Sequence, residues 1–433
     1  MNSHVIISLV VFDTTNTLIL SNRVNKSVAA LLGGMAMILL HVVSEEVAYR
    51  SIDLSVIFLL IGMMIITHFL AESGFFGYVA IRVIQFANVR PVPVMILLCL
   101  VTGLLSALVD NVTTILLVAP VTFLMAEQAE IDPIPYLMFE VMAANIGGTA
   151  TLIGDPPNIL IGSRAGLTFN EFLIHVGPAA AVCLVVSVAV GALRIRRQPL
   201  LSADLRARIL EMKAARAISD RRLLVKSAGV LLVVLALFVL HDVIHVGPAP
   251  IALAGAAVLL LLTRADPVKV FRIVEWPMLF FFIGLFVTVS GLVSSGVIDM
   301  TAKAALSLTS HDLLVTTLVI LWLSAIGSAA VGAVPVVVAL IPIVQNIIPE
   351  VQGNATGTDP AIAAYALWWA LSLGACLGGN GTVLGTACNI VAVEIARGNR
   401  REISPVHFMR IGVPIMGITL AISTVYILMR YLW

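Results

Sequence analysis

A long apolar segment, residues 134–162, is interrupted by Asn145-Ile146-Gly147-Gly148-Thr149-Ala150-Thr151-Leu152-Ile153-Gly154-Asp155-Pro156-Pro157-Asn158. Paired glycines and paired prolines disrupt an α-helix, and irregular backbone at membrane depth is tolerated only where protein, water or a ligand satisfies the freed N–H and C=O groups. Freed carbonyls with Asn and Thr oxygens suit a cation such as Na⁺, whereas helix N-termini favour an anion or a polar solute. The segment therefore predicts a broken membrane helix that lines a binding site.

A second segment of the same kind lies within residues 362–396 and reads Gly378-Gly379-Asn380-Gly381-Thr382-Val383-Leu384-Gly385-Thr386-Ala387-Cys388-Asn389. Five residues of the first segment recur there at a constant spacing of 231 residues: Gly147, Gly148, Thr151, Gly154 and Asn158 match Gly378, Gly379, Thr382, Gly385 and Asn389. Eight earlier residues recur at a spacing of 222 residues: Gly62, Ser73, Gly74, Ser106, Ala107, Val109, Val112 and Pro120 match Gly284, Ser295, Gly296, Ser328, Ala329, Val331, Val334 and Pro342. Simple kinks would explain one Gly or Pro, but two matching clusters predict an internal repeat.

The composition places these segments in a membrane. Of 433 residues, 60% are apolar and only 11% are charged, against about 25% charged in an ordinary soluble protein. This composition excludes a soluble enzyme of several domains. Because one crossing needs ~20 mostly apolar residues, we predict an all-α protein with about ten spans: 4–20, 27–43, 54–70, 134–162, 172–193, 227–241, 250–263, 277–293, 362–396 and 408–430. Two further apolar pairs, 93–127 and 312–345, have polar or Gly-rich middles and are predicted to be re-entrant hairpins.

Five spans and one hairpin fall on each side of a basic linker, residues 194–226. We therefore predict a first repeat over 1–193 and a second repeat over 227–433, which enters the bilayer in the opposite orientation. Lys and Arg favour the cytoplasmic side, so the linker is predicted to be cytoplasmic and both termini to lie outside. The net charge of +1 gives no general attraction to nucleic acid. A surface for nucleic acid or another anionic partner is the alternative interpretation of the linker.

Two aspartates lie in segments expected within the bilayer, Asp110 at the tip of the first hairpin and Asp155 in the first broken helix. An ionised side chain at the bilayer centre costs at least ~2.5 to 3.5 kcal/mol on insertion scales. Both aspartates are therefore predicted to face a polar path and to exchange a proton or a cation; the alternative is that one only caps a half-helix. Their counterparts in the second half are Gly332 and Thr386, so charge is handled asymmetrically. Glu140, one turn before Asn145, either extends the path or pairs with a scaffold group.

The four cysteines, Cys99, Cys183, Cys376 and Cys388, lie in apolar stretches, which argues against a disulfide framework or a zinc site. Cys376 and Cys388 flank the second broken helix. Soft thiolates can bind a metalloid, but cysteine also packs readily between helices, and both interpretations stay open.

Three stretches carry a family resemblance: Asp110-Asn111-Val112-Thr113-Thr114, the segment from Asn145 to Asn158, and Gly374-Ala375-Cys376-Leu377-Gly378-Gly379-Asn380-Gly381-Thr382. They resemble the ion transporter superfamily, and within it the group of arsenite permeases, NhaD-type Na⁺/H⁺ antiporters and the melanosomal P protein. The resemblance implies an elevator-type fold with a scaffold domain and a mobile transport domain, frequent dimerisation, and a place in the cell (inner) membrane. It also implies substrate or ion binding by Asn111, Thr113, Asn158, Asn380, Thr382 and Asn389, with Na⁺ near Asn111 and Asn158. The polar segments themselves add Asp110, Thr114, Asn145, Thr149, Thr151 and Asp155 to the predicted site.

One departure from the family pattern affects the predicted substrate. Relatives often repeat Asp-Asn before Ile-Pro in the second hairpin, but here Gly332-Ala333 precede Val334-Pro335. This favours a carrier of a neutral or weakly charged solute coupled to one ion over a dedicated Na⁺/H⁺ antiporter. Arsenite is mostly neutral As(OH)₃ at neutral pH, and its hydroxyls suit Asn and Thr partners. We therefore predict proton-coupled efflux of arsenite and antimonite. The alternatives are Na⁺/H⁺ antiport and transport of a dicarboxylate or another organic anion.

Other functional classes fit the sequence poorly. An intramembrane aspartyl protease would use Asp110 and Asp155 as a dyad, but Leu152 occupies the position where a Gly-x-Gly-Asp motif needs glycine, and a protease does not explain a repeated second half. There is no Gly-x-Ser-x-Gly or His-Glu-x-x-His motif and no nucleotide-binding loop. We predict no enzyme activity and no cofactor, with H⁺ (or Na⁺) as the coupling ion. A separate ATPase subunit docking on the basic linker is conceivable from the resemblance alone.

Overall fold

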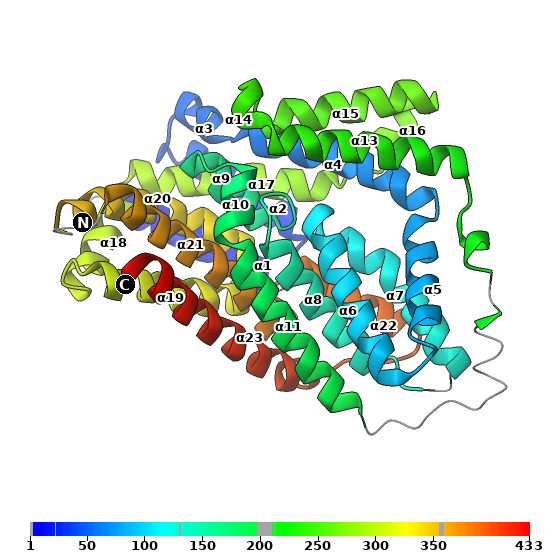
Figure 1. Ribbon diagram of the computed structural model, residues 1–433. Coiled ribbons are helices and arrows are strands. Elements are labelled where there is room, and N and C mark those ends of the chain that lie inside the picture. The colour runs from blue at the N-terminus through cyan, green and yellow to red at the C-terminus, as the bar shows by residue number, and fades with distance from the viewer. Residues whose placement is uncertain (1–2, 22, 130, 197–209, 212, 355–358) are drawn as a thin grey trace.

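The structure, a computed structural model, describes residues 3–21, 23–129, 131–196, 210–211, 213–354 and 359–433. Within these residues every regular element is helical (Figure 1). The first half contains α1 (Ser3–Ser21), α2 (Lys26–Leu39), α3 (Glu45–Ser51), α4 (Leu54–Glu72), α5 (Phe75–Phe86), α6 (Pro91–Leu108), α7 (Asn111–Ala129), α8 (Ile134–Thr149), α9 (Pro156–Ala165), α10 (Phe169–His175) and α11 (Gly177–Ile195). A 3₁₀ turn, η1 (Ala214–Ala217), follows. The second half contains α13 (Arg221–Val239), α14 (His241–Ile244), α15 (Pro248–Thr263), α16 (Pro267–Phe271), α17 (Trp276–Ser294), α18 (Val297–Leu308), α19 (Leu313–Val331), α20 (Ala333–Asn354), α21 (Pro360–Gly378), η2 (Gly379–Gly381), α22 (Ala387–Gly398), α23 (Pro405–Ile427) and the π-helical turn η3 (Leu428–Leu432).

The prediction of an all-α polytopic membrane protein is confirmed. Among the described residues, 10 helices are long and apolar enough to cross a bilayer. Seven of them coincide with predicted spans, and the other three are α6, α19 and α20, which are arms of the predicted hairpins. The predicted span 27–43 is too long, because α2 has 14 residues. The predicted span 250–263 agrees with α15, which has 16 residues, except for two residues at the start of the helix. The helix α2 begins only after its cap, Asn25, and ends at Leu39.

Two amphipathic helices, α5 and α18, lie outside the predicted spans because each has only 12 residues, too few for a long apolar run. Each begins after a glycine in the left-handed region, Gly74 at φ +83° and Gly296 at φ +80°. A left-handed backbone suits glycine because it has no Cβ to clash, so this glycine turns the chain sharply out of the preceding long helix. The two glycines are one of the residue pairs that recur at 222 residues.

The same spacing relates whole helices. Adding 222 to the bounds of α4 and α5 gives the bounds of α17 and α18, and adding 231 to the start of α9 gives the start of α22. This correspondence of elements supports the two-repeat interpretation, whereas the opposite orientation of the halves in a bilayer stays a prediction. Of the predicted linker 194–226, residues 197–209 and 212 lie outside the described part of the chain.

The two halves interlock through reciprocal helix crossings. The helix α2 packs on α17 of the other half, and its counterpart α15 packs on α4; Figure 1 shows α13 and α15 running alongside α4. Glycine allows the backbones to approach at both crossings. A Cβ on Gly284 would lie 2.3 Å from the carbonyl carbon of Ala30, and one on Gly62 would lie 2.6 Å from that of Ala252. The helices α2, α4, α15 and α17 therefore form one interlocked unit, which we call the scaffold.

Replacing Gly284 with Val is expected to destabilise this scaffold. The new side chain would meet backbone, which cannot move aside as a flexible side chain can, and overpacking costs typically ~1 to 3 kcal/mol, occasionally more. The measurement is the melting temperature of the detergent-purified protein. Gly229→Val is the matched control, because nothing lies within 4 Å of a Cβ at Gly229. Equal melting temperatures for the two variants would contradict the close crossing.

Candidate functional site

Each hairpin is tied to the broken helix of its own half by the same two hydrogen bonds. In the first half, Ser106 Oγ donates to Ala144 O at 2.7 Å and Thr151 Oγ1 donates to Ala107 O at 2.6 Å. In the second half, the equivalent bonds run from Ser328 Oγ to Ala375 O at 2.6 Å and from Thr382 Oγ1 to Ala329 O at 2.5 Å. The predicted site residues Thr151 and Thr382 therefore hold the hairpin tips against the breaks in α8–α9 and α21–α22.

Asn145 joins the two halves. Its Nδ2 donates to Asn380 Oδ1 at 3.0 Å and to Asn389 Oδ1 at 2.9 Å, both from the second broken helix. Its Oδ1 accepts from Asn111 Nδ2 at 3.1 Å and from Thr386 Oγ1 at 3.3 Å. Four of the predicted site residues thus form one buried amide network, which we call the asparagine network (Asn111, Asn145, Asn380 and Asn389, with Thr386).

Two asparagines satisfy the backbone freed by the breaks. Asn158 Nδ2 donates to the carbonyls of Thr149 and Thr151, each at 3.0 Å, and Asn389 Nδ2 donates to Gly379 O and Thr382 O at 2.8 and 2.7 Å. Asn158 Oδ1 in turn accepts from Ser372 Oγ at 2.7 Å and from Cys376 Sγ at 3.4 Å. An amide has two donors and two acceptor positions, so Asn158 is fully occupied by protein partners.

Cys376 is the counterpart of Asn145 in the repeat, and it occupies the equivalent position beside the broken helix. It donates to the Asn158 carbonyl as Asn145 donates to the Asn389 carbonyl. All four cysteines are buried and free of disulfides. Among the described residues, no group of three or more His, Cys, Asp or Glu side chains is arranged to hold a metal ion.

The two aspartates have different surroundings. Asp110 Oδ1 accepts from the backbone N of Thr113 at 2.8 Å and so caps α7, while Thr114 Oγ1 bonds the carbonyl of Asp110 at 2.9 Å. Asp155 precedes α9 but makes no capping bond with its side chain. Its Oδ1 accepts from Asn111 Nδ2 at 3.3 Å, and its buried Oδ2 has no hydrogen-bond partner. The capping role therefore belongs to Asp110, and Asp155 keeps a carboxylate oxygen available.

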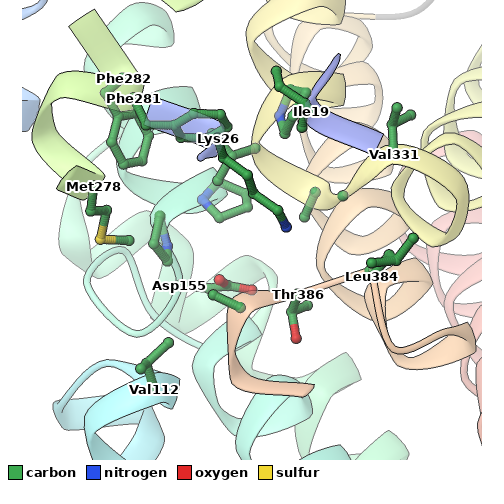
Figure 2. A pocket seen from close by; sticks show the side chains of 18 of the residues that line it. Ile19, Lys26, Val112, Asp155, Met278, Phe281, Phe282, Val331, Leu384 and Thr386 are labelled. Carbon is green, nitrogen blue, oxygen red and sulfur yellow. The ribbon is translucent and has the colours of Figure 1, made fainter. Parts of the chain in front are cut away.

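A cavity of about 230 Å³ lies beside Asp155 (Figure 2). The first residues of four helices line it: Asn111 of α7, Pro156 of α9, Ala333 of α20 and Ala387 of α22. In Figure 2 the amino group of Lys26 extends into the same space toward Asp155 and Thr386. The exposed Glu275, just before α17, lies at the cavity wall.

Of the predicted site residues, only Asn111 and Asp155 line this cavity. The other predicted asparagines and threonines form the asparagine network or the hydrogen bonds of the two broken helices. Asp110, Thr113 and Thr114 belong to the tip of the first hairpin. Lys26, Glu275 and Thr386 were not predicted. Lys26 and Glu275 lie far apart in the sequence, and the packing of α2 on α17 brings them together. One feature of the sequence could have indicated Thr386 as a site residue: it is the counterpart of Asp155 in the repeat.

The far end of α9 is fastened to the scaffold. Arg164 Nη2 donates to Ser51 O at 2.5 Å, and its Nε lies 3.5 Å from Asp53 Oδ2. Ser163 Oγ donates to the same carboxylate oxygen at 2.6 Å. These contacts join α9 to the segment between α3 and α4, away from the cavity that the start of α9 lines.

Comparison with known proteins identifies the family. The sequence profile of the CitMHS family, described as citrate transporter, matches residues 17–374. The chain belongs to this family. It is therefore a multi-pass membrane protein and a secondary transporter, and it is not an enzyme, which removes the aspartyl protease alternative.

Similar proteins extend over the whole chain. An uncharacterized transporter of Mycobacterium tuberculosis is 41% identical over 430 residues, covering 98% of both chains. A 46 kDa membrane protein of Mycobacterium leprae is 40% identical over 431 residues, covering 99% of both. The P protein of Mus musculus is 30% identical over 502 residues, covering 96% of this chain and 59% of that protein. The predicted resemblance to the P protein group is thereby confirmed.

The fold resembles a solved transporter. The crystal structure of the YdaH transporter of Alcanivorax borkumensis superimposes with a TM-score of 0.54 over 87% of this chain and 85% of that chain. The sequence identity is only 17%, so the likeness concerns the fold alone.

Proposed function

We propose that this chain is a proton-coupled transporter of a small organic anion of the carboxylate class, bound in the cavity beside Asp155. The observation that supports it most is the convergence of four helix N-termini and Lys26 on one cavity. Helix N-termini carry partial positive charge and unpaired N–H groups, and they favour carboxylates and other anions. The description of the family as citrate transporters agrees with this substrate class.

Coupling to protons follows from the acidic groups in the same cavity. An ionised Asp155 would repel a bound carboxylate, and Glu275 at the wall adds to the repulsion. Protonation of Asp155 removes a negative charge, so the proton and the anion bind together more favourably than the anion alone. Binding of the two on one side and release on the other is proton–anion symport.

Efflux of arsenite and antimonite, the prediction from the sequence, is the second candidate. It is favoured by the neutral amide and hydroxyl groups of Asn111 and Thr386 at the cavity, which suit the hydroxyls of As(OH)₃. The thiol of Cys376 contacts Asn158 and does not line the cavity, so this candidate rests on hydroxyl and amide partners rather than on thiolates. In this case Asp155 would release its proton in exchange for the solute.

The transport cycle we propose is of the elevator type. The two hairpins and two broken helices, joined by the asparagine network, form the unit that moves against the interlocked helices α2, α4, α15 and α17. We propose that the cavity, which Lys26 and Glu275 line, faces the cytoplasm in this conformation. We also retain the inner membrane, external termini and a homodimer as proposals. A separate ATPase subunit has no further support.

Transport assays in proteoliposomes test the proposal. Purified protein is reconstituted, a pH gradient is imposed, and radiolabelled citrate, arsenite and Na⁺ are followed in parallel. We expect gradient-dependent, saturable citrate movement that a protonophore abolishes. Arsenite movement without citrate movement would establish the second candidate, and Na⁺-driven proton movement alone would establish the antiporter alternative. A gradient-independent flux of all three would contradict coupled transport.

A further inference from the structure

A second buried acid lies outside the cavity. Glu140, in the middle of α8, has no solvent exposure. Its Oε1 accepts a hydrogen bond of 2.6 Å from Thr122 Oγ1 of α7, and its buried Oε2 has no hydrogen-bond partner. The cavity beside Asp155 is not lined by either residue. The site described above therefore gives Glu140 no role.

Within the described part of the chain, no ion pair compensates a charge on Glu140. The titratable groups that interact with it are the Cys99 thiol of α6 and the Tyr136 phenol of α8, both neutral at ordinary pH. Among the described residues of α11, α21, α22 and α23, which also pack on α8, no charged side chain pairs with it. A buried carboxylate without a counter-charge is strongly disfavoured. Burial without a counter-charge therefore favours the protonated form of Glu140 over the ionised form in this conformation.

The repeat shows that packing does not require this acid. The positions equivalent to Thr122 and Glu140 are Val344 and Leu371, both with no solvent exposure. An apolar pair thus fills the same place between the hairpin and the broken helix in the second half. Replacing a buried polar pair with apolar residues of similar volume is often neutral or stabilising, so a purely structural role explains Glu140 poorly.

A polar cavity lies next to the pair along α7 but is lined by neither Thr122 nor Glu140. Phe123, the residue after Thr122, lines a polar cavity of about 500 Å³ together with Glu127, Asp132 and Arg401. At the other end of the same helix α7, Asn111 bonds both Asn145 and Asp155. The helix α7 therefore contacts both buried acids, Asp155 from its first residue and Glu140 from Thr122 in its second half.

On the basis of the proposed proton-coupled transport, we propose that Glu140 is a second proton-binding site, distinct from Asp155. Glu140 keeps its proton while Thr122 and α7 shield its carboxyl from water, as they do in this structure. When α7 shifts relative to α8, the carboxyl reaches the water of the adjoining cavity and releases the proton there as H₃O⁺, leaving a carboxylate. The carboxylate takes up its next proton from water on the opposite face of the membrane after the conformational change, so one additional proton crosses the membrane in each cycle.

Two measurements on the full-length protein test this site. The first is a pH titration of carboxyl infrared bands in purified protein, which needs no transported solute. We expect a titrating protonated-carboxyl band that disappears in Glu140→Gln and persists in Asp155→Asn. The second is the number of protons moved per solute in proteoliposomes, which we expect to fall by one in Glu140→Gln. An unchanged titration together with an unchanged ratio in Glu140→Gln would overturn the proposal.

Control variants separate folding from proton binding. The double variant Thr122→Val with Glu140→Leu copies the apolar pair of the second half and is expected to fold with the stability of the parent protein while losing the same band. If Glu140→Gln does not fold, Thr122→Val keeps the carboxyl and removes its hydrogen bond. That variant should shift the pH at which the band titrates, and an unchanged midpoint would overturn the proposal. Failure of wild-type transport with a titrating Glu140 band would refute the proposed function but not the proton site.

Discussion

Replacing Asp155 with Asn is expected to reduce proton-driven solute accumulation to the level of empty proteoliposomes. The variant removes the buried carboxylate that lines the cavity and has an oxygen without a hydrogen-bond partner, so binding and release of the solute can no longer be linked to a proton. An Asn side chain has the same shape and keeps an oxygen that can accept the bond from Asn111, so the fold should persist. The measurement is the initial rate of labelled solute uptake under an imposed pH gradient, with size-exclusion chromatography as the check on folding.

Asp110→Asn is the matched control for this prediction. The Asp110 carboxylate caps α7 through the backbone N of Thr113, and Asn caps helices about as well as Asp. Gradient-driven uptake should therefore survive in Asp110→Asn. If instead Asp110→Asn lost coupling while Asp155→Asn kept it, the proton would belong to the hairpin tip rather than to the cavity.

Replacing Asn145 with Leu is expected to abolish transport and to destabilise the protein by several kcal/mol. Leu has a similarly branched side chain but no polar atoms, so Asn111, Asn380, Asn389 and Thr386 would lose a partner within a buried cluster. Each buried polar group left unsatisfied costs about 1 to 3 kcal/mol, against a total stability of about 5 to 15 kcal/mol for a typical protein. Thermal unfolding in detergent and uptake in proteoliposomes measure the two effects.

Asn399→Ala provides the comparison for Asn145→Leu. The exposed amide of Asn399 bonds only the carbonyl of Ile395 at the end of α22, and surface substitutions of this kind usually change stability by less than about 0.5 kcal/mol. Similar melting temperatures for Asn145→Leu and Asn399→Ala would show that the asparagine network does not hold the two broken helices together.

Much of the fold was predictable because its determinants are local in sequence. Paired glycines and prolines mark both helix breaks, and the α8–α9 and α21–α22 breaks occur within the quoted segments. The hairpin tips at Asp110 and Gly332 were likewise visible as polar or Gly-rich interruptions of apolar runs. The end of α2 was less predictable, since apolar composition alone does not mark where a helix ends.

The cavity was less predictable because its walls come from distant parts of the chain. Lys26 and Glu275 are brought to Asp155 by the crossing of α2 with α17, and no local pattern reports that crossing. The sequence also did not show which aspartate caps a helix and which lines the cavity. Both precede a helix, and capping depends on the side-chain rotamer. The sequence placed Asp155 next to Pro156, which suggested a cap, whereas Asp110 forms one.

The most direct test of the account is the accessibility of the cavity from the two sides of the membrane. Ala387, exposed at the start of α22, lines the cavity and can be changed to Cys after the four native cysteines are replaced. A membrane-impermeant maleimide is then applied to one face or the other of oriented vesicles. Alternating access at a single site predicts labelling of Ala387→Cys from both faces, with solute protecting it on each. Labelling from one face only, unaffected by solute and by the pH gradient, would contradict the account.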